Sequence, residues 1–165
     1  MSKRFQRITP FLWFNEEAEE AAQHYVSVFD NSRILAVTRY DSETAKAARR
    51  PADTVMTVAF ELDGESFTAL NGGPSFTFNP AISLVVNCRT QEEVDHYWHA
   101  LSEGGDPSFQ ACGWLQDRFG VSWQVVPVQL MELLTSGDAA KAQRVMQAVL
   151  TMKKLDLDAL QKAAA

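Results

Sequence analysis

The sequence predicts an α+β protein built from two βαβββ modules and a set of C-terminal helices. Three observations support this fold class. Strand-like and helix-like patterns occur in the same order in both halves of the chain. The two halves align at an offset of 72 residues, from Leu12 to Leu84. From Val128 onward the apolar residues recur with helical spacing.

The first module, residues 6–73, begins with a strand and a helix. Residues 8–14 form a short apolar and aromatic run with strand character. Asn15 is the expected N-cap of a helix over 16–29, whose acidic first turn suits the helix dipole. A strand is predicted over 32–40.

A loop and a hairpin complete the first module. Residues 41–53 are polar and rich in Ala and Arg, which predicts a mobile loop. Asp63-Gly64 separates the runs 55–62 and 66–71, and this dipeptide is a strong hairpin signal. Gly72-Gly73-Pro74 is expected to end the sheet.

The second module, residues 79–127, repeats the order. A strand over 81–87 precedes a helix over 90–103, with Thr90 and Glu93 as a capping box. Two further strands are expected over 109–116 and 119–127.

Residues 128–165 are expected to form a helical extension that completes a single domain, residues 1–165. The expected helices carry leucine, valine and methionine on one side. Short helices are marginal in water, so this apolar side must pack on the sheet or on a second subunit.

The charge balance excludes some classes of partner. Fifteen Lys and Arg against 21 Asp and Glu give a net charge of -6 and a pI near 5.0, so no basic footprint for nucleic acid is visible. No apolar run reaches the length of a membrane span, and no signal-peptide pattern follows the basic N-terminus. We expect a soluble cytoplasmic protein in which Cys88 and Cys112 are reduced thiols.

The repeated unit resembles the vicinal oxygen chelate superfamily, which includes glyoxalase I, bleomycin and fosfomycin resistance proteins and extradiol dioxygenases. The closer resemblance is to its PhnB-like branch, often labelled 3-demethylubiquinone-9 3-methyltransferase. The segments that carry it are Ile8-Thr-Pro-Phe-Leu-Trp-Phe14, Ala18-Glu-Glu-Ala-Ala-Gln-His-Tyr25, Phe67-Thr-Ala-Leu-Asn-Gly-Gly73, the run from Cys112 to Pro127, and the tail from Gln143 to Leu160.

This resemblance implies a glyoxalase-like fold of curved mixed sheets, with a helix on one side of each sheet and a ligand cavity on the other. The cavity is often closed by the partner of a homodimer. Strand alternation then directs Thr9, Phe11 and Trp13 into the cavity. The ligand-binding candidates are Thr9, Phe11, Trp13, Asn71, Ser83, Cys112, Trp114 and Gln124.

The resemblance also indicates where a metal ion would lie. Matched by position to metal-dependent members, the ligand positions hold Thr9, Asn71, Ala81 or Ser83, and Gln124. These side chains are neutral, and they include neither carboxylate nor imidazole, so we expect no metal. His24, His96 and His99 fall on predicted helices, away from the cavity.

The sequence contains no recognisable motif for the active site of a methyltransferase or a hydrolase. No glycine-rich turn leads from a strand into a helix, as S-adenosylmethionine sites usually require, and we expect no cofactor. Three interpretations remain open. The protein binds a small, largely apolar molecule in a metal-free cavity of a homodimer, or it is an isomerase, lyase or transferase whose chemistry is unrecognised, or it is a non-catalytic dimer with a vestigial cavity.

Overall fold

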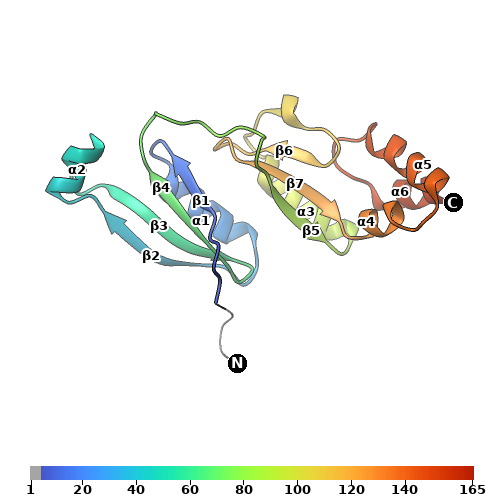
Figure 1. Cartoon of the computed structure of the whole chain (residues 1–165), viewed down its shortest axis with the longest axis horizontal. Coiled ribbons are helices and arrows are strands. Elements are labelled where there is room, and N and C mark those ends of the chain that lie inside the picture. Colours follow the sequence, from blue (N-terminus) through green and yellow to red (C-terminus); the bar gives the residue numbers. More distant parts are fainter. Residues whose placement is uncertain (1–4) are drawn as a thin grey trace. The chain divides into compact units, whose positions relative to one another are not determined.

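The structure is a computed structural model that describes residues 5–165. The described residues divide into two compact units, with the boundary between Thr77 and Phe78 (Figure 1). The boundary falls in the segment that separates the two predicted modules. Each unit has its own sheet, and each sheet carries a helix directly after its first strand.

The first unit contains a four-stranded mixed sheet. Its strands are β1 (Phe11–Phe14), β2 (Arg33–Arg39), β3 (Val55–Leu62) and β4 (Glu65–Asn71), and its helices are α1 (Ala18–Val28) and α2 (Ser42–Ala48). The order is β1-β4-β3-β2, with β1 parallel to β4 and the other neighbours antiparallel. The predicted hairpin is confirmed: Asp63 and Gly64 have φ values of 46° and 83°, as a tight two-residue turn requires.

Helix α1 packs on one face of this sheet. Its alanines Ala18, Ala21 and Ala22 are fully buried, and their small side chains let the helix lie close to the strands. Tyr25 fills the space beyond them, with its ring centroid 6.4 Å from that of Phe60 on β3. Burying each large apolar side chain stabilises the fold by about 1.5–3 kcal/mol.

The prediction of a mobile loop over 41–53 is wrong for the first half of that segment, because residues Ser42–Ala48 form helix α2. The Asp41 side chain accepts hydrogen bonds from the backbone N–H groups of Glu43 and Thr44, and the Thr44 hydroxyl accepts one from the backbone N–H of Asp41. This reciprocal cap and the alanines that follow outweigh the polar composition of the segment. Arg49 ends the helix in the left-handed region, with φ 55°.

The second unit contains a three-stranded mixed sheet and one helix packed on it. Its elements are β5 (Leu84–Cys88), α3 (Gln91–Ser102), a 3-10 turn η1 (Pro107–Phe109), β6 (Trp114–Gln116) and β7 (Ser122–Pro127). The order is β5-β7-β6, with β5 parallel to β7 and β6 antiparallel to β7. The strand–helix start and the parallel pairing of the first strand with the last recur in both units, so the predicted fold class, two mixed sheets with helices, is confirmed.

In the described part of the chain the second sheet has three strands, one for each range predicted there and one fewer than a βαβββ module contains. The strand expected over 109–116 is confirmed only from Trp114 onward. Before it, Asp106 caps η1 through the backbone N–H of Ser108. Cys112 and Gly113 then turn the chain with φ values of 54° and 84°. Two successive residues in the left-handed region cannot continue a strand.

Three C-terminal helices complete the second unit. They are α4 (Gln129–Leu134), α5 (Ala139–Val149) and α6 (Leu157–Ala164). Their cluster of Val145, Val149, Leu155 and Leu160 packs against Val126 of β7 and against Cys112. The backbone N–H groups of Cys112 and Gly113 donate to the carbonyls of Met152 and Lys153, both at 2.8 Å. Within residues 5–165, no helix is both long and apolar enough to cross a bilayer.

Candidate functional site

The face of the first sheet opposite α1 carries three of the expected site residues. On β1, Phe14 is buried against α1, whereas Phe11 points the other way and is 59% exposed. Trp13 shares the parity of Phe11 on β1, and Thr9 lies two residues before the strand begins. We call this face, which bears Thr9, Phe11 and Trp13, the open face.

Trp13 is held at one end of the open face by its neighbours. Its indole N–H donates to the carbonyl of Gly73 at 2.9 Å, and Phe76 packs against its ring edge to face, with centroids 5.0 Å apart. A Cβ on Gly72 would lie only 2.3 Å from the ring, so only glycine permits this ring position. These contacts hold the ring in one position.

A hollow of about 510 Å³ lies beside Trp13. Tyr40, Met56 and Leu70 give it aromatic and aliphatic walls, and Thr44 and Ser75 add hydroxyl groups. Ala47 and Ala48 of α2 also line it, so the helix that sequence analysis missed forms part of this wall. A fixed aromatic ring, aliphatic walls and a few neutral polar groups suit an apolar, planar molecule.

A second hollow, of about 560 Å³, lies at the Thr9 end of the open face. Sequence analysis missed its most unusual residue, Glu61 of β3, which is only 4% exposed. Its Oε2 atom accepts from Nε of Arg33 on β2 at 3.1 Å. The signal was available: Phe60 and Leu62 are apolar, so the residue between them must face away from α1.

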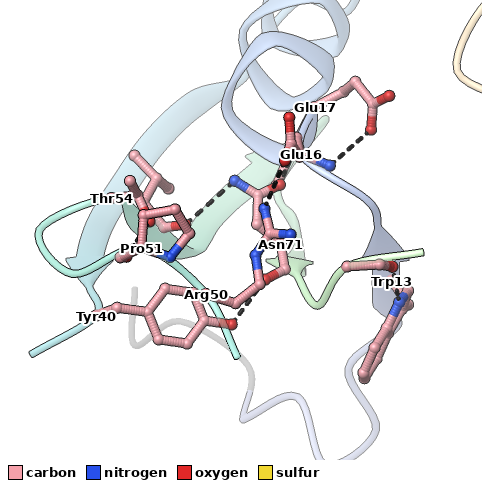
Figure 2. Close-up of polar contacts among 11 residues, drawn as sticks. Trp13, Glu16, Glu17, Tyr40, Arg50, Pro51, Thr54 and Asn71 are labelled. Atoms are coloured by element: carbon pink, nitrogen blue, oxygen red, sulfur yellow. Dashed lines mark hydrogen bonds and ion pairs between the residues drawn. The ribbon is translucent and has the colours of Figure 1, made fainter. Parts of the chain in front are cut away.

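Asn71 does not join Thr9, Phe11 and Trp13, because it lies on the α1 side of the sheet. Its Oδ1 atom accepts from the backbone N–H of Ala18 at 2.8 Å and its Nδ2 atom donates to the carbonyl of Val55 at 3.2 Å (Figure 2). Its own carbonyl accepts from the hydroxyl of Tyr40 at 2.7 Å. Asn71 thus caps a helix that has no side-chain cap of its own.

Arg50 lies beside Asn71 in a further hollow of about 340 Å³ (Figure 2). Its Nη2 atom is 3.0 Å from Oε1 of Glu16, and the side chains are 12% and 66% exposed. The pair ties the segment after α2 to the start of α1. Because one partner is largely in water, the ion pair contributes at most about 1 kcal/mol.

The remaining candidates all lie in the second unit, where three of them come together. Nε2 of Gln124 donates to the hydroxyl of Ser83 at 2.9 Å, and Trp114 is the cross-strand partner of Gln124. Ser83 lies just before β5, which starts at Leu84 rather than at residue 81. The fourth candidate, Cys112, lies in the turn before β6 and packs against the C-terminal helices.

The residues at the expected metal positions do not fit a metal ion. Asn71 faces away from Thr9, and the amide of Gln124 is hydrogen bonded to Ser83. Within residues 5–165, no three His, Cys, Asp or Glu side chains gather as a ligand set. That the protein is free of metal stays a prediction, which metal analysis of the purified protein tests.

The residues also do not fit S-adenosylmethionine at a glycine-rich turn. Gly72 and Gly73 follow β4, but no helix starts after them, and the Trp13 ring occupies the space above Gly72. Gly104 and Gly105 follow a helix rather than a strand. Cys88, the other thiol, is buried, and burial raises its pKa to about 12, with the nearby charge of Glu93 as a second cause. It is therefore no nucleophile at neutral pH.

Comparisons with known proteins give the family. The family model described as 3-demethylubiquinone-9 3-methyltransferase matches residues 6–126. A PhnB protein from Bacillus cereus, described there as a candidate 3-demethylubiquinone-9 3-methyltransferase, is 38% identical; the match covers 74% of this chain and 100% of that chain, with a TM-score of 0.63. Protein PA1353 from Pseudomonas aeruginosa is 25% identical over 74% of this chain and 98% of its own, with a TM-score of 0.57. The search of curated proteins finds no match.

The family model ends at the last strand of the second sheet, so α4, α5 and α6 lie outside it. Inside it lie both sheets, the open face and the Gln124 cluster. The match covers well over half of the chain and agrees with the fold. The chain therefore belongs to the PhnB-like family described as 3-demethylubiquinone-9 3-methyltransferase.

Proposed function

We propose that this protein binds a small, largely apolar molecule on the open face of its first sheet, without a metal ion or a cofactor. The observation that carries the proposal is the fixed ring of Trp13 beside a hollow of about 510 Å³. A ring already held in place loses little freedom when a planar ligand stacks on it, so more of the contact energy appears as affinity.

The proposal includes a homodimer in which a partner subunit covers the open face. Phe11 on β1 is 59% exposed and Leu35 on β2 is 45% exposed, and large exposed apolar side chains on a sheet are a feature of association sites. A partner there would turn an open hollow into a closed cavity. A cytoplasmic location belongs to the same proposal, and the presence of only two cysteines, too few for a disulfide framework, supports it.

Ligand binding is tested with 4-biphenylmethanol, a neutral and flat probe. We expect it to shift the amide resonances of β1 and β4 and to raise the melting temperature. Trp13→Leu should weaken its binding about tenfold, because the stacking surface is lost. Phe11→Ala, at an exposed position that the fold tolerates, should weaken binding several-fold. Trp98→Leu, on α3 of the second unit, is the matched control and should leave the affinity unchanged.

The results also separate the alternatives. Binding that survives both Trp13→Leu and Phe11→Ala would contradict the proposed face. No binding, with side chains packed over the face in a crystal of the dimer, would favour a non-catalytic dimer. Chemical conversion of the probe by the protein, or binding of the probe only after a divalent metal is added, would favour an enzyme.

The dimer is tested separately by sedimentation. We expect the wild-type protein to sediment as a dimer, and Phe11→Asp to shift it toward monomer, since a charge on an apolar interface is costly. A wild-type protein that remains monomeric at all accessible concentrations would overturn this part of the proposal.

A further inference from the structure

The hollow at the Thr9 end of the open face contains a carboxylate that is almost entirely withdrawn from water. The side chain of Glu61 is only 6% exposed. It faces away from α1 because its neighbours Phe60 and Leu62 face toward the helix. A desolvated carboxylate is costly unless a positive charge lies close to it.

Two carboxylates belong to the described lining of this hollow. Phe5 and Leu35 give it apolar walls, Thr9 and Ser66 add polar groups, and Glu61 and Glu65 contribute two carboxylates. Among the residues described as lining it, none is Lys, Arg or His. Gln6 fixes the rim, because its side-chain amide exchanges two hydrogen bonds with the backbone of Ser66.

One cationic partner of Glu61 comes from outside this lining. Arg33 of β2 reaches it through Nε at 3.1 Å, but the arginine side chain is 68% exposed. The pair is therefore asymmetric, with a buried anion and a cation that remains largely hydrated. A hydrated guanidinium can move into water at small cost, whereas the carboxylate cannot.

We propose that Glu61 binds the cationic amine group of the ligand in place of Arg33. The ligand class is thus an apolar, aromatic molecule with one protonated amine. The cross-strand partners of Glu61 and Trp13 are Ser66 and Leu70, which are four residues, about 13 Å, apart on β4. Such a molecule would therefore reach from Glu61 past Phe11 toward Trp13. This inference rests on the proposed function, since it concerns the charge of the ligand at the same face.

The experiment compares three probes of one shape, namely 4-biphenylmethylamine, 4-biphenylmethanol and 4-biphenylcarboxylate. Affinities are measured by calorimetry with the full chain, and the amide resonances of Ser66 and Thr68 report the place of binding. We expect the amine to bind about tenfold more tightly than the alcohol, and the carboxylate to bind most weakly. Glu61→Gln, which keeps the size of the side chain, should remove the preference for the amine and leave the alcohol unaffected.

Two more variants make the test independent of how well Glu61→Gln folds. Arg33→Gln, at an exposed side chain, should strengthen amine binding several-fold, because a cation that competes for Glu61 is gone. Glu43→Gln removes a charge from α2, where the side chain is 84% exposed, and should change nothing. If Arg33→Gln weakens amine binding, or leaves it unchanged, the competition between the two cations is refuted.

The outcomes also distinguish this inference from the proposed function. If the alcohol binds and depends on Trp13 while the amine shows no preference, the inference fails and the function stands. The inference also fails, and the function stands, if the preference for the amine survives Glu61→Gln. The Glu61–Arg33 ion pair would then serve only to connect β2 and β3. If none of the three probes binds the open face, both fail.

Discussion

At the scale of single residues, Asn71 shows how one side chain joins several elements. Its side chain accepts a hydrogen bond from the backbone N–H of Ala18 in α1 and donates one to the carbonyl of Val55 in β3. Its backbone carbonyl accepts a hydrogen bond from the hydroxyl of Tyr40. The equivalent position in the second unit is Val125. Asn71 pairs with Phe14 across the first sheet, and Val125 pairs with Val86, the repeat equivalent of Phe14, across the second. There α3 is capped by its own Thr90, so no buried amide is needed.

Replacing Asn71 by alanine should destabilise the first unit by about 2 kcal/mol, because the buried N–H of Ala18 loses its acceptor. Denaturant unfolding measures the loss in the free energy of unfolding. Amide exchange in α1 shows where in the first unit the loss occurs. Asn87→Ala on the exposed side of β5 is the control and should stay within about 0.5 kcal/mol of wild type. Equal effects of the two substitutions would contradict the capping role.

Cys88 gives a prediction about reactivity. Because burial raises the pKa of its thiol to about 12, almost none is ionised near neutral pH, and the thiol is also shielded. Iodoacetamide at about pH 8 should leave Cys88 unmodified in the native protein and modify it in concentrated guanidinium chloride. Peptide mass spectrometry checks this, and rapid native modification would show that β5 is not packed as described.

At the scale of elements, the C-terminal segment is tied to α3 by an ion pair with a pH-dependent contribution. Lys154 and then Gln91 donate to the carboxylate of Asp95, and these hydrogen bonds lower its pKa below the usual 3.8. A lowered carboxylate pKa means that the stabilisation is fully present above the unfolded-state value. It is lost as the pH falls below about 4 and through the folded-state pKa.

Asp95→Asn should therefore cost less than about 1 kcal/mol at neutral pH, because both side chains are partly exposed. The difference between variant and wild type should shrink as the pH falls through that acidic range, and it should also shrink in high salt. Amide exchange of the second sheet, measured at several pH values, tests this. A difference that is the same at neutral and acidic pH would exclude the ion pair as its cause.

At the scale of the whole molecule, the extension is part of the second unit although it lies outside the matched family region. The carbonyls of Met152 and Lys153 accept the N–H groups of Cys112 and Gly113, and Gln91 of α3 bonds to the backbone of Leu155 and Leu157. The extension therefore supports the turn before β6 and the start of α3.

Deleting residues 128–165 should destabilise the second unit by about 3 kcal/mol or more, since these hydrogen bonds and an apolar cluster are lost together. Hydrogen exchange read peptide by peptide is the measurement. Peptides of β7 should lose protection, and those of β3 in the first unit should keep it as the internal control. Unchanged protection of β7 would mean that the second sheet does not depend on the extension.

Some elements could be predicted because their signals are local. The Asp63-Gly64 turn fixes its own backbone, and Thr90 caps α3 from within the sequence. Alternation along β1 was enough to separate Phe11 from Phe14. Helix α2 was missed because its cap pairs Asp41 with Thr44, which in a polar segment also suits a loop.

The sequence by itself determined the repeated order of strands and helices, the family, and which side of β1 faces the helix, because each depends on neighbouring residues or on residue identity. Only the tertiary structure decided that Asn71 faces α1, that Cys112 lies in a turn against the C-terminal helices, and that Glu61 is buried beside Thr9. These facts depend on strand pairing and on contacts between residues far apart in the chain. No local pattern encodes which distant backbone a side chain will meet.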